Sequence, residues 1–168
     1  MANNEKSVAD RLQRLEARQA IGDLVARYCF LLDQRRIAEV ARLFASNGRY
    51  ATVTPGVDVR GGDEIKNYFA ERFSVLGVTN HVVHQQIVEI ADQQCDSAVG
   101  TVSSHAEICV DGKAMLVALR YDDSYIVEEG VWRFSERLMT FLYYAPVEGY
   151  AKAFLAANNL VPVRMPGR

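Results

Sequence analysis

Residues 115–145, MLVALRYDDSYIVEEGVWRFSERLMTFLYYA, contain two long runs rich in β-branched and aromatic residues, over 115–127 and 131–145. The glycine-containing stretch EEG separates them, and this arrangement predicts two antiparallel strands joined by a tight turn. Two similar runs precede them, over residues 81–90 and 98–110, with the turn-rich stretches DQQCD and DGK between the strands. The second half of the chain is therefore predicted to be a meander of four long strands.

The first half of the chain has mainly helical patterns. Apolar residues follow helical spacing over residues 8–32, and a polar break at 33–36 leads into a shorter helix over 37–44. SNG at 46–48 is expected to end this helical part as a turn. RYATVTP and VDVRG then predict two short strands, and helical spacing returns over residues 61–73. Helices first and long strands after predict an α+β fold, with helices against one face of a curved antiparallel sheet.

Size and composition fit one domain. The chain has 168 residues, of which 49% are hydrophobic, enough for a single core. We expect one domain over residues 1–168, with a core over about 8–145 and a C-terminal arm, including a short helix, over about 146–168. The net charge of -2, without a basic stripe or polybasic patch, argues against nucleic acid or membrane partners. A polar N-terminus without an apolar leader predicts a cytoplasmic protein.

Cofactor motifs are not evident in the sequence. No phosphate loop, GxSxG elbow or dinucleotide fingerprint appears. The three cysteines lack CxxC spacing, so neither a zinc site nor a disulfide is expected. We therefore expect no cofactor and no metal.

Three segments carry a resemblance to a known group of proteins: ARQAIGDLVARYCFLLDQRRIAEVARLF, NHVVHQQIVEI and RYDDSYIVEEGVWRFSERL. In order and spacing they resemble the SnoaL-like branch of the nuclear-transport-factor-two-like superfamily. The resemblance implies a cone-shaped α+β barrel, cystatin-like, whose open end holds a hydrophobic pocket. This superfamily includes scytalone dehydratase, bile-acid 7α-dehydratase, hexachlorocyclohexane dehydrochlorinase, ketosteroid isomerase, polyketide cyclases and noncatalytic subunits. One fold with many functions leaves the function to be argued from the site.

The resemblance also implies site residues. Dehydratase and dehydrochlorinase members use an aspartate at the end of the first helix and a histidine at the start of the third strand, and Asp33 and His81 occupy these places. The bile-acid dehydratase pattern adds a tyrosine five residues before the aspartate, which Tyr28 matches. A further polar residue on the next strand has its nearest counterpart in His105, although its spacing would turn it to the other face of a regular strand. The second tyrosine of scytalone dehydratase falls near Thr52.

An aspartate bonded to an imidazole fixes the ring tautomer, and histidine can move protons near neutral pH without a cofactor. Asp33 and His81, assisted by Tyr28, therefore predict a cofactor-independent lyase or isomerase, resembling the dehydratases and dehydrochlorinase, that acts on a small hydrophobic, cyclic molecule. Phe141 and Tyr143 close the last predicted strand and are candidates to line an apolar pocket.

Each of these residues also has a plainer interpretation. Asp33 could be a solvated residue or cap the second helix, although a carboxylate at a helix C-terminus is unfavourable unless a cation or proton donor offsets the helix dipole. His81 could be a core histidine, and Tyr28 could serve packing alone. His84, three residues after His81, should face the opposite side of a strand, so we do not expect a two-histidine metal site. We expect His84 to bond to the backbone in the core or at its rim.

A different class of function is also open. A noncatalytic binding or assembly subunit, resembling the small subunit of aromatic-ring-hydroxylating dioxygenases, would have a cavity filled by side chains, and Asp33 and His81 would not touch. Long sheets of this fold commonly pair across subunits, so we expect a homo-oligomer, a trimer or a dimer. Arg120 and Asp123 are expected to form a surface ion pair or a subunit contact.

Overall fold

The computed structural model describes residues 7–54, 56–91 and 94–156. Its first element is helix α1 (Val8–Asp33), 26 residues long, which confirms the helix predicted over residues 8–32. A capping box starts it, because the Ser7 hydroxyl accepts from the Asp10 N–H while the Asp10 carboxylate accepts from the Ser7 N–H. The buried face of α1 consists of Ala17, Ile21, Leu24, Val25, Tyr28, Cys29 and Leu32.

Six strands form one curved mixed sheet in the order β2-β1-β6-β5-β4-β3. Their bounds are β1 (Phe44–Thr52), β2 (Val57–Arg60), β3 (Leu76–Ile90), β4 (Ser97–Val110), β5 (Lys113–Glu128) and β6 (Val131–Pro146). All neighbours are antiparallel except β1 and β6, which pair in parallel. The α+β fold class and the four-stranded meander predicted from the sequence are confirmed.

Two-residue turns set the register of the meander. Asp111 and Gly112 connect β4 to β5 with φ of 50° and 75°, and Glu129 and Gly130 connect β5 to β6 with φ of 52° and 75°. Positive φ at both central positions is the type I′ geometry that matches the twist of paired strands. The DG and EG dipeptides therefore set the antiparallel register beside each turn; β4 and β5 keep it throughout, whereas the pairing of β5 with β6 shifts between Ala118 and Leu119 and between Ser124 and Tyr125.

The structure corrects the expected boundaries around residue 46. The second helix, α2 (Ile37–Arg42), ends before residue 44, and residues 46–48 lie inside β1 instead of ending the helical part as a turn. The pairing of β1 with β6 shifts between Phe44 and Arg49, so these residues form an irregularity in the ladder. Gly48 is suited to it, because a Cβ there would lie 2.9 Å from the carbonyl oxygens of Ala45 and Phe134.

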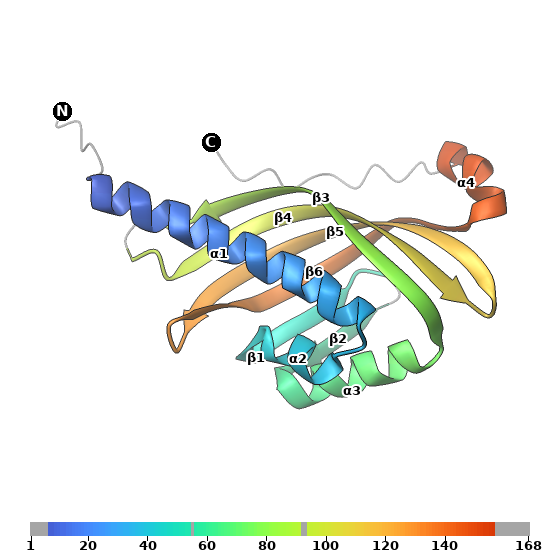
Figure 1. The fold of residues 1–168 in the computed structure, drawn as a ribbon, viewed down its shortest axis with the longest axis horizontal. Coiled ribbons are helices and arrows are strands. Elements are labelled where there is room, and N and C mark those ends of the chain that lie inside the picture. The colour runs from blue at the N-terminus through green and yellow to red at the C-terminus, as the bar shows by residue number, and fades with distance from the viewer. Residues whose placement is uncertain (1–6, 55, 92–93, 157–168) are drawn as a thin grey trace.

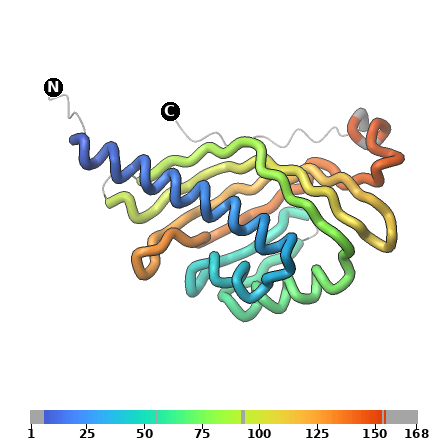
Figure 2. The backbone as a smooth tube through the Cα atoms, viewed as in Figure 1, coloured from blue at the N-terminus to red at the C-terminus, as the bar shows by residue number. Residues whose placement is uncertain are grey.

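The three helices that precede β3 cover the concave face of the sheet (Figure 1). Helix α1 runs along β3, while α2 and α3 (Gly61–Ser74) lie beside the β1–β2 hairpin, as the tube in Figure 2 also shows. After β6 follow a short 3-10 turn (Val147–Gly149) and α4 (Tyr150–Ala156), so a closing helix is present, while the rest of the predicted arm lies outside the described residues. Within the described part of the chain, no helix combines the length and apolar character needed to cross a membrane.

Candidate active site

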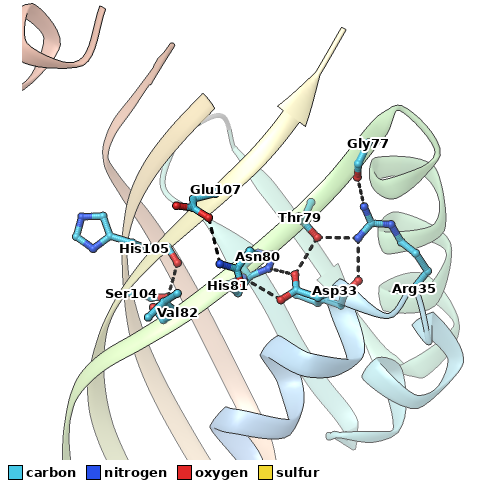
Figure 3. Close-up of polar contacts among 11 residues, drawn as sticks. Asp33, Arg35, Gly77, Thr79, Asn80, His81, Val82, Ser104, His105 and Glu107 are labelled. Carbon is cyan, nitrogen blue, oxygen red and sulfur yellow. Dashed lines mark hydrogen bonds and ion pairs between the residues drawn. The ribbon is translucent and has the colours of Figure 1, made fainter. Parts of the chain in front are cut away.

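Asp33 and His81, 48 residues apart in sequence, meet where the end of α1 lies on β3 (Figure 3). His81 Nδ1 lies 2.6 Å from Asp33 Oδ1, and the His81 backbone N–H donates to Oδ2 at 2.9 Å. The Thr79 hydroxyl donates to Oδ1 at 2.8 Å, because the strand pleat places Thr79 and His81 on the same face. Three donors thus hold the Asp33 carboxylate in one orientation, and its interpretation as a solvated residue or helix cap is wrong.

Arg35 stabilises the same corner and was not identified from the sequence. It follows α1 in the left-handed conformation, with φ of 60°, and its guanidinium donates to the Leu32 carbonyl at 2.9 Å and to the Thr79 hydroxyl at 2.7 Å. It also donates to the carbonyl of Gly77 (Figure 3). Arg35 therefore supplies a cation beside the C-terminus of α1, and the His81 ring supplies a proton donor to the carboxylate.

The electrostatics of the pair fix the tautomer of the ring. Burial of the Asp33 carboxyl raises its pKa, but hydrogen bonds from the His81 ring, the His81 amide and Thr79 outweigh burial, so the pKa lies below its ordinary value. Asp33 is then ionised at neutral pH and can only accept hydrogen bonds, which places the proton of the neutral imidazole on Nδ1. Nε2 keeps its lone pair and can act as a base.

His81 forms part of the wall of a cavity of about 820 Å³ between the helices and the concave face of the sheet. A volume of this size is in the range of small-molecule sites. Most of its lining is apolar or aromatic, with contributions from Leu32, Phe69, Ile108, Val117, Leu119 and Met139. Thr52, Phe141 and Tyr143, predicted as pocket residues, also line it. Tyr50 and Tyr121 line it too, and sequence reasoning missed both.

Tyr28 combines the two roles considered for it. It is only 1% exposed and packs edge-on against Phe44, Phe69, Tyr121 and Phe134, yet it also lines the cavity. Burial raises the pKa of its hydroxyl well above the ordinary value, an effect that nearby Tyr121 adds to. Tyr28 is therefore a neutral phenol at neutral pH, able to donate a hydrogen bond.

A buried ion pair lies beneath Tyr28. Arg137 and Asp123 contact each other at 2.7 and 2.9 Å, and both side chains are fully buried. The Arg137 guanidinium lies 4.1 to 4.3 Å from the ring centroids of Tyr28, Tyr121 and Phe134, which is cation–π geometry. The expectation that Asp123 makes a surface pair with Arg120 is wrong. Its alternation with Tyr121 and Tyr125 along β5 was the sequence signal that it faces the core.

His105 and His84 lie outside this site. His105 is on the opposite face of the sheet from His81, as its spacing predicted, and its ring points away from Asp33 in Figure 3. Its Nδ1 lies 2.6 Å from His84 Nε2, and its Nε2 lies 2.8 Å from the Tyr143 hydroxyl. His84 is exposed and bonds to a ring, so the expectation of a core or rim histidine bonded to the backbone is wrong.

Sequence comparison places the chain in a known family. Residues 13–138 match the SnoaL-like domain. The chain belongs to the SnoaL-like domain family. None of the curated proteins is similar enough in sequence to count as a relative of this SnoaL-like chain.

Several solved structures share the fold of this SnoaL-like protein. LinA matches with a TM-score of 0.77 at 21% identity, covering 83% of this chain and 95% of that chain. The hexachlorocyclohexane dehydrochlorinase LinA-type3 from Novosphingobium barchaimii matches with a TM-score of 0.75 at 20% identity, with coverage of 83% and 95%. An NTF2-like protein with a cystatin-like fold from Novosphingobium aromaticivorans matches at 0.66 and 23% identity, with coverage of 92% and 97%. At these identities the similarity establishes the shared fold.

Proposed function

We propose that this SnoaL-like protein is a cofactor-independent lyase or isomerase that acts on a small hydrophobic, cyclic molecule. The observation that carries the proposal is the 2.6 Å contact between His81 Nδ1 and Asp33 at the wall of an apolar cavity. The names of structural neighbours support the same class of reaction, since they include a hexachlorocyclohexane dehydrochlorinase and a scytalone dehydratase-like protein.

In the proposed reaction His81 Nε2 removes a proton from a carbon next to an activating group. The electrons of the broken C–H bond form a C=C bond, and chloride or hydroxide leaves from the neighbouring carbon, or a double bond migrates and the proton returns from Nε2. Asp33 stabilises the imidazolium that forms, through an ionised carboxylate that stays in place. The protonated hydroxyl of Tyr28 donates a hydrogen bond to a carbonyl or to the leaving group.

Two features favour an enzyme over a noncatalytic assembly subunit. Such a subunit would have its cavity filled by side chains, whereas about 820 Å³ is open in this fold. It would also have no reason to hold Asp33 and His81 together, whereas hydrogen bonds of Thr79 and Arg35 orient this pair here.

The test is turnover of a panel of chlorinated cyclohexanes, cyclic β-hydroxy ketones and β,γ-unsaturated cyclic ketones. Chloride release and the absorbance of new conjugated double bonds would be measured. His81→Ala should lower kcat by about a hundredfold to ten-thousandfold, the usual contribution of a positioned general base. His84→Ala is the matched control, because this histidine is on the same strand and faces away from the cavity, and it should keep the wild-type rate.

Turnover that survives His81→Ala would contradict the proposal. So would a panel in which the wild-type protein neither turns over any compound nor exchanges its acidic C–H protons with deuterated solvent.

A further inference from the structure

The fixed charge of the cavity lining comes, among the described residues, from a single side chain. Among the described residues that line it, Arg72 is the only one with a fixed charge, and none is Asp or Glu. His81 is titratable, but its partner Asp33 lies behind it with both carboxylate oxygens already bonded to donors. The space available to a ligand is therefore apolar with positive character.

Arg72 has no ion-pair partner among the described residues. It lies in the last turn of α3 and is partly buried beside Tyr68, one turn earlier. Burial raises the pKa of Tyr68 and the nearby guanidinium partly offsets this. Within residues 7–54, 56–91 and 94–156, no carboxylate forms an ion pair with Arg72. Arg49 and Arg137, by contrast, each bind carboxylates at 2.7 to 2.9 Å.

We propose that Arg72 binds the carboxylate of the ligand, so that the substrate is a hydrophobic, cyclic carboxylic acid. A guanidinium presents a planar pair of donors that matches both oxygens of a carboxylate. The substrate class rests on the function proposed above, in which His81 performs the proton transfer, but the binding of the acid does not depend on catalysis.

Charge balance favours a carboxylate over a phosphate. One guanidinium neutralises a monoanion, whereas a phosphate dianion would keep an uncompensated charge among apolar side chains, which is costly. The aromatic and aliphatic lining then contacts the rest of the molecule, as in other apolar ligand sites with few polar groups. Arg72 in this arrangement determines ligand specificity, because it binds acids more tightly than their neutral analogues.

The experiment compares two ligands of equal shape, 2-naphthoate and 2-naphthamide, by isothermal titration calorimetry at pH 7. The wild-type protein should bind the carboxylate about 10- to 100-fold more tightly than the amide, the preference expected from one charge-assisted hydrogen-bond pair. R72Q should abolish this preference and leave the affinity for the amide unchanged. R72K keeps the charge but loses the planar fork, so it should retain part of the preference.

Two control variants separate the possible outcomes. R60Q removes the same charge from an exposed arginine that does not line the cavity, and it should keep the wild-type preference. H84A, at a histidine that faces away from the cavity, should also keep it. Because calorimetry measures binding without turnover, a failure of the catalytic proposal would not be mistaken for a failure of this one. Equal affinities in the wild-type protein, a preference that survives R72Q, or no binding of 2-naphthoate at millimolar concentration would each overturn the inference.

Discussion

Asp33→Asn is the sharpest perturbation of the proposed site, because its effect follows from the donors around the carboxylate. The His81 backbone N–H, which donates to Oδ2, cannot reverse its direction, so the asparagine oxygen must take that position. The asparagine amide group then faces His81 Nδ1, where the aspartate accepted a hydrogen bond. A donor in that place favours the tautomer with the proton on Nε2. The cavity would lose its base while the packing around residue 33 is preserved.

The expected fall in kcat for Asp33→Asn has two parts. Loss of a charge-assisted hydrogen bond to the imidazolium costs about 1.5 to 3 kcal/mol, or roughly 10- to 100-fold in rate. The inverted tautomer increases the loss of rate further, and the same substitution in a serine protease triad lowers kcat by about ten-thousandfold. We therefore expect kcat to fall by about a hundredfold to ten-thousandfold on whichever panel substrate the wild-type protein turns over.

The assay is steady-state kinetics, with circular dichroism to establish that the variant is folded. Asp23→Asn is the control, since it removes the same charge from an exposed position of α1. A folded Asp33→Asn protein with kcat within about fivefold of the wild-type value would refute the assigned role of the carboxylate, because even the smaller part of the effect exceeds that.

Three further predictions concern stability and assembly. Arg137→Leu leaves the fully buried Asp123 carboxylate without its cation and should lower the free energy of unfolding by about 3 to 5 kcal/mol in urea titrations. Adding Asp123→Leu should recover most of this loss, and a loss below about 1 kcal/mol in the single variant would contradict the account. Burial and the neighbouring His84 ring lower the pKa of His105, so the unfolded chain takes up a proton before the folded protein does. The free energy of unfolding should therefore fall as pH drops below about 6.5, and His105→Gln should flatten this part of the stability–pH profile. An unchanged profile in the variant would rule out His105 as the cause. The homo-oligomer stays a prediction. Light scattering at micromolar concentration would test it, and a monomeric mass would contradict it.

Most of the fold could be predicted because local signals and global pairing agree. The DG and EG turns need only two residues in positive φ, and the strands on either side carry regular alternation. The same kind of local signal was misleading at residues 46–48, where SNG suggested a turn. Whether a glycine there ends an element or accommodates a bulge depends on the partner strand β6, which lies far away in sequence.

The candidate site was predictable only in part. Asp33 and His81 could be identified because their places in the order of elements resemble those of known enzymes. Thr79 and Arg35 were missed, although Thr79 shares a strand face with its neighbour two residues on. Arg72 gave no signal at all, because an arginine on an amphipathic helix looks like part of a solvated face until the packing of that helix is known.

The anchoring of helix α1 limits which changes in chain length the protein can accept. Tyr28 is fixed in the core against the Arg137 guanidinium, and Asp33 ends the same helix five residues later. Each residue of an α-helix advances about 1.5 Å and turns about 100°. An insertion or deletion of one residue between these two positions would swing the carboxylate away from β3 while the core stayed intact. Such a length variant would fold, but its His81 ring would have no carboxylate partner. The number of residues between Tyr28 and Asp33 therefore sets the position of the carboxylate relative to the imidazole.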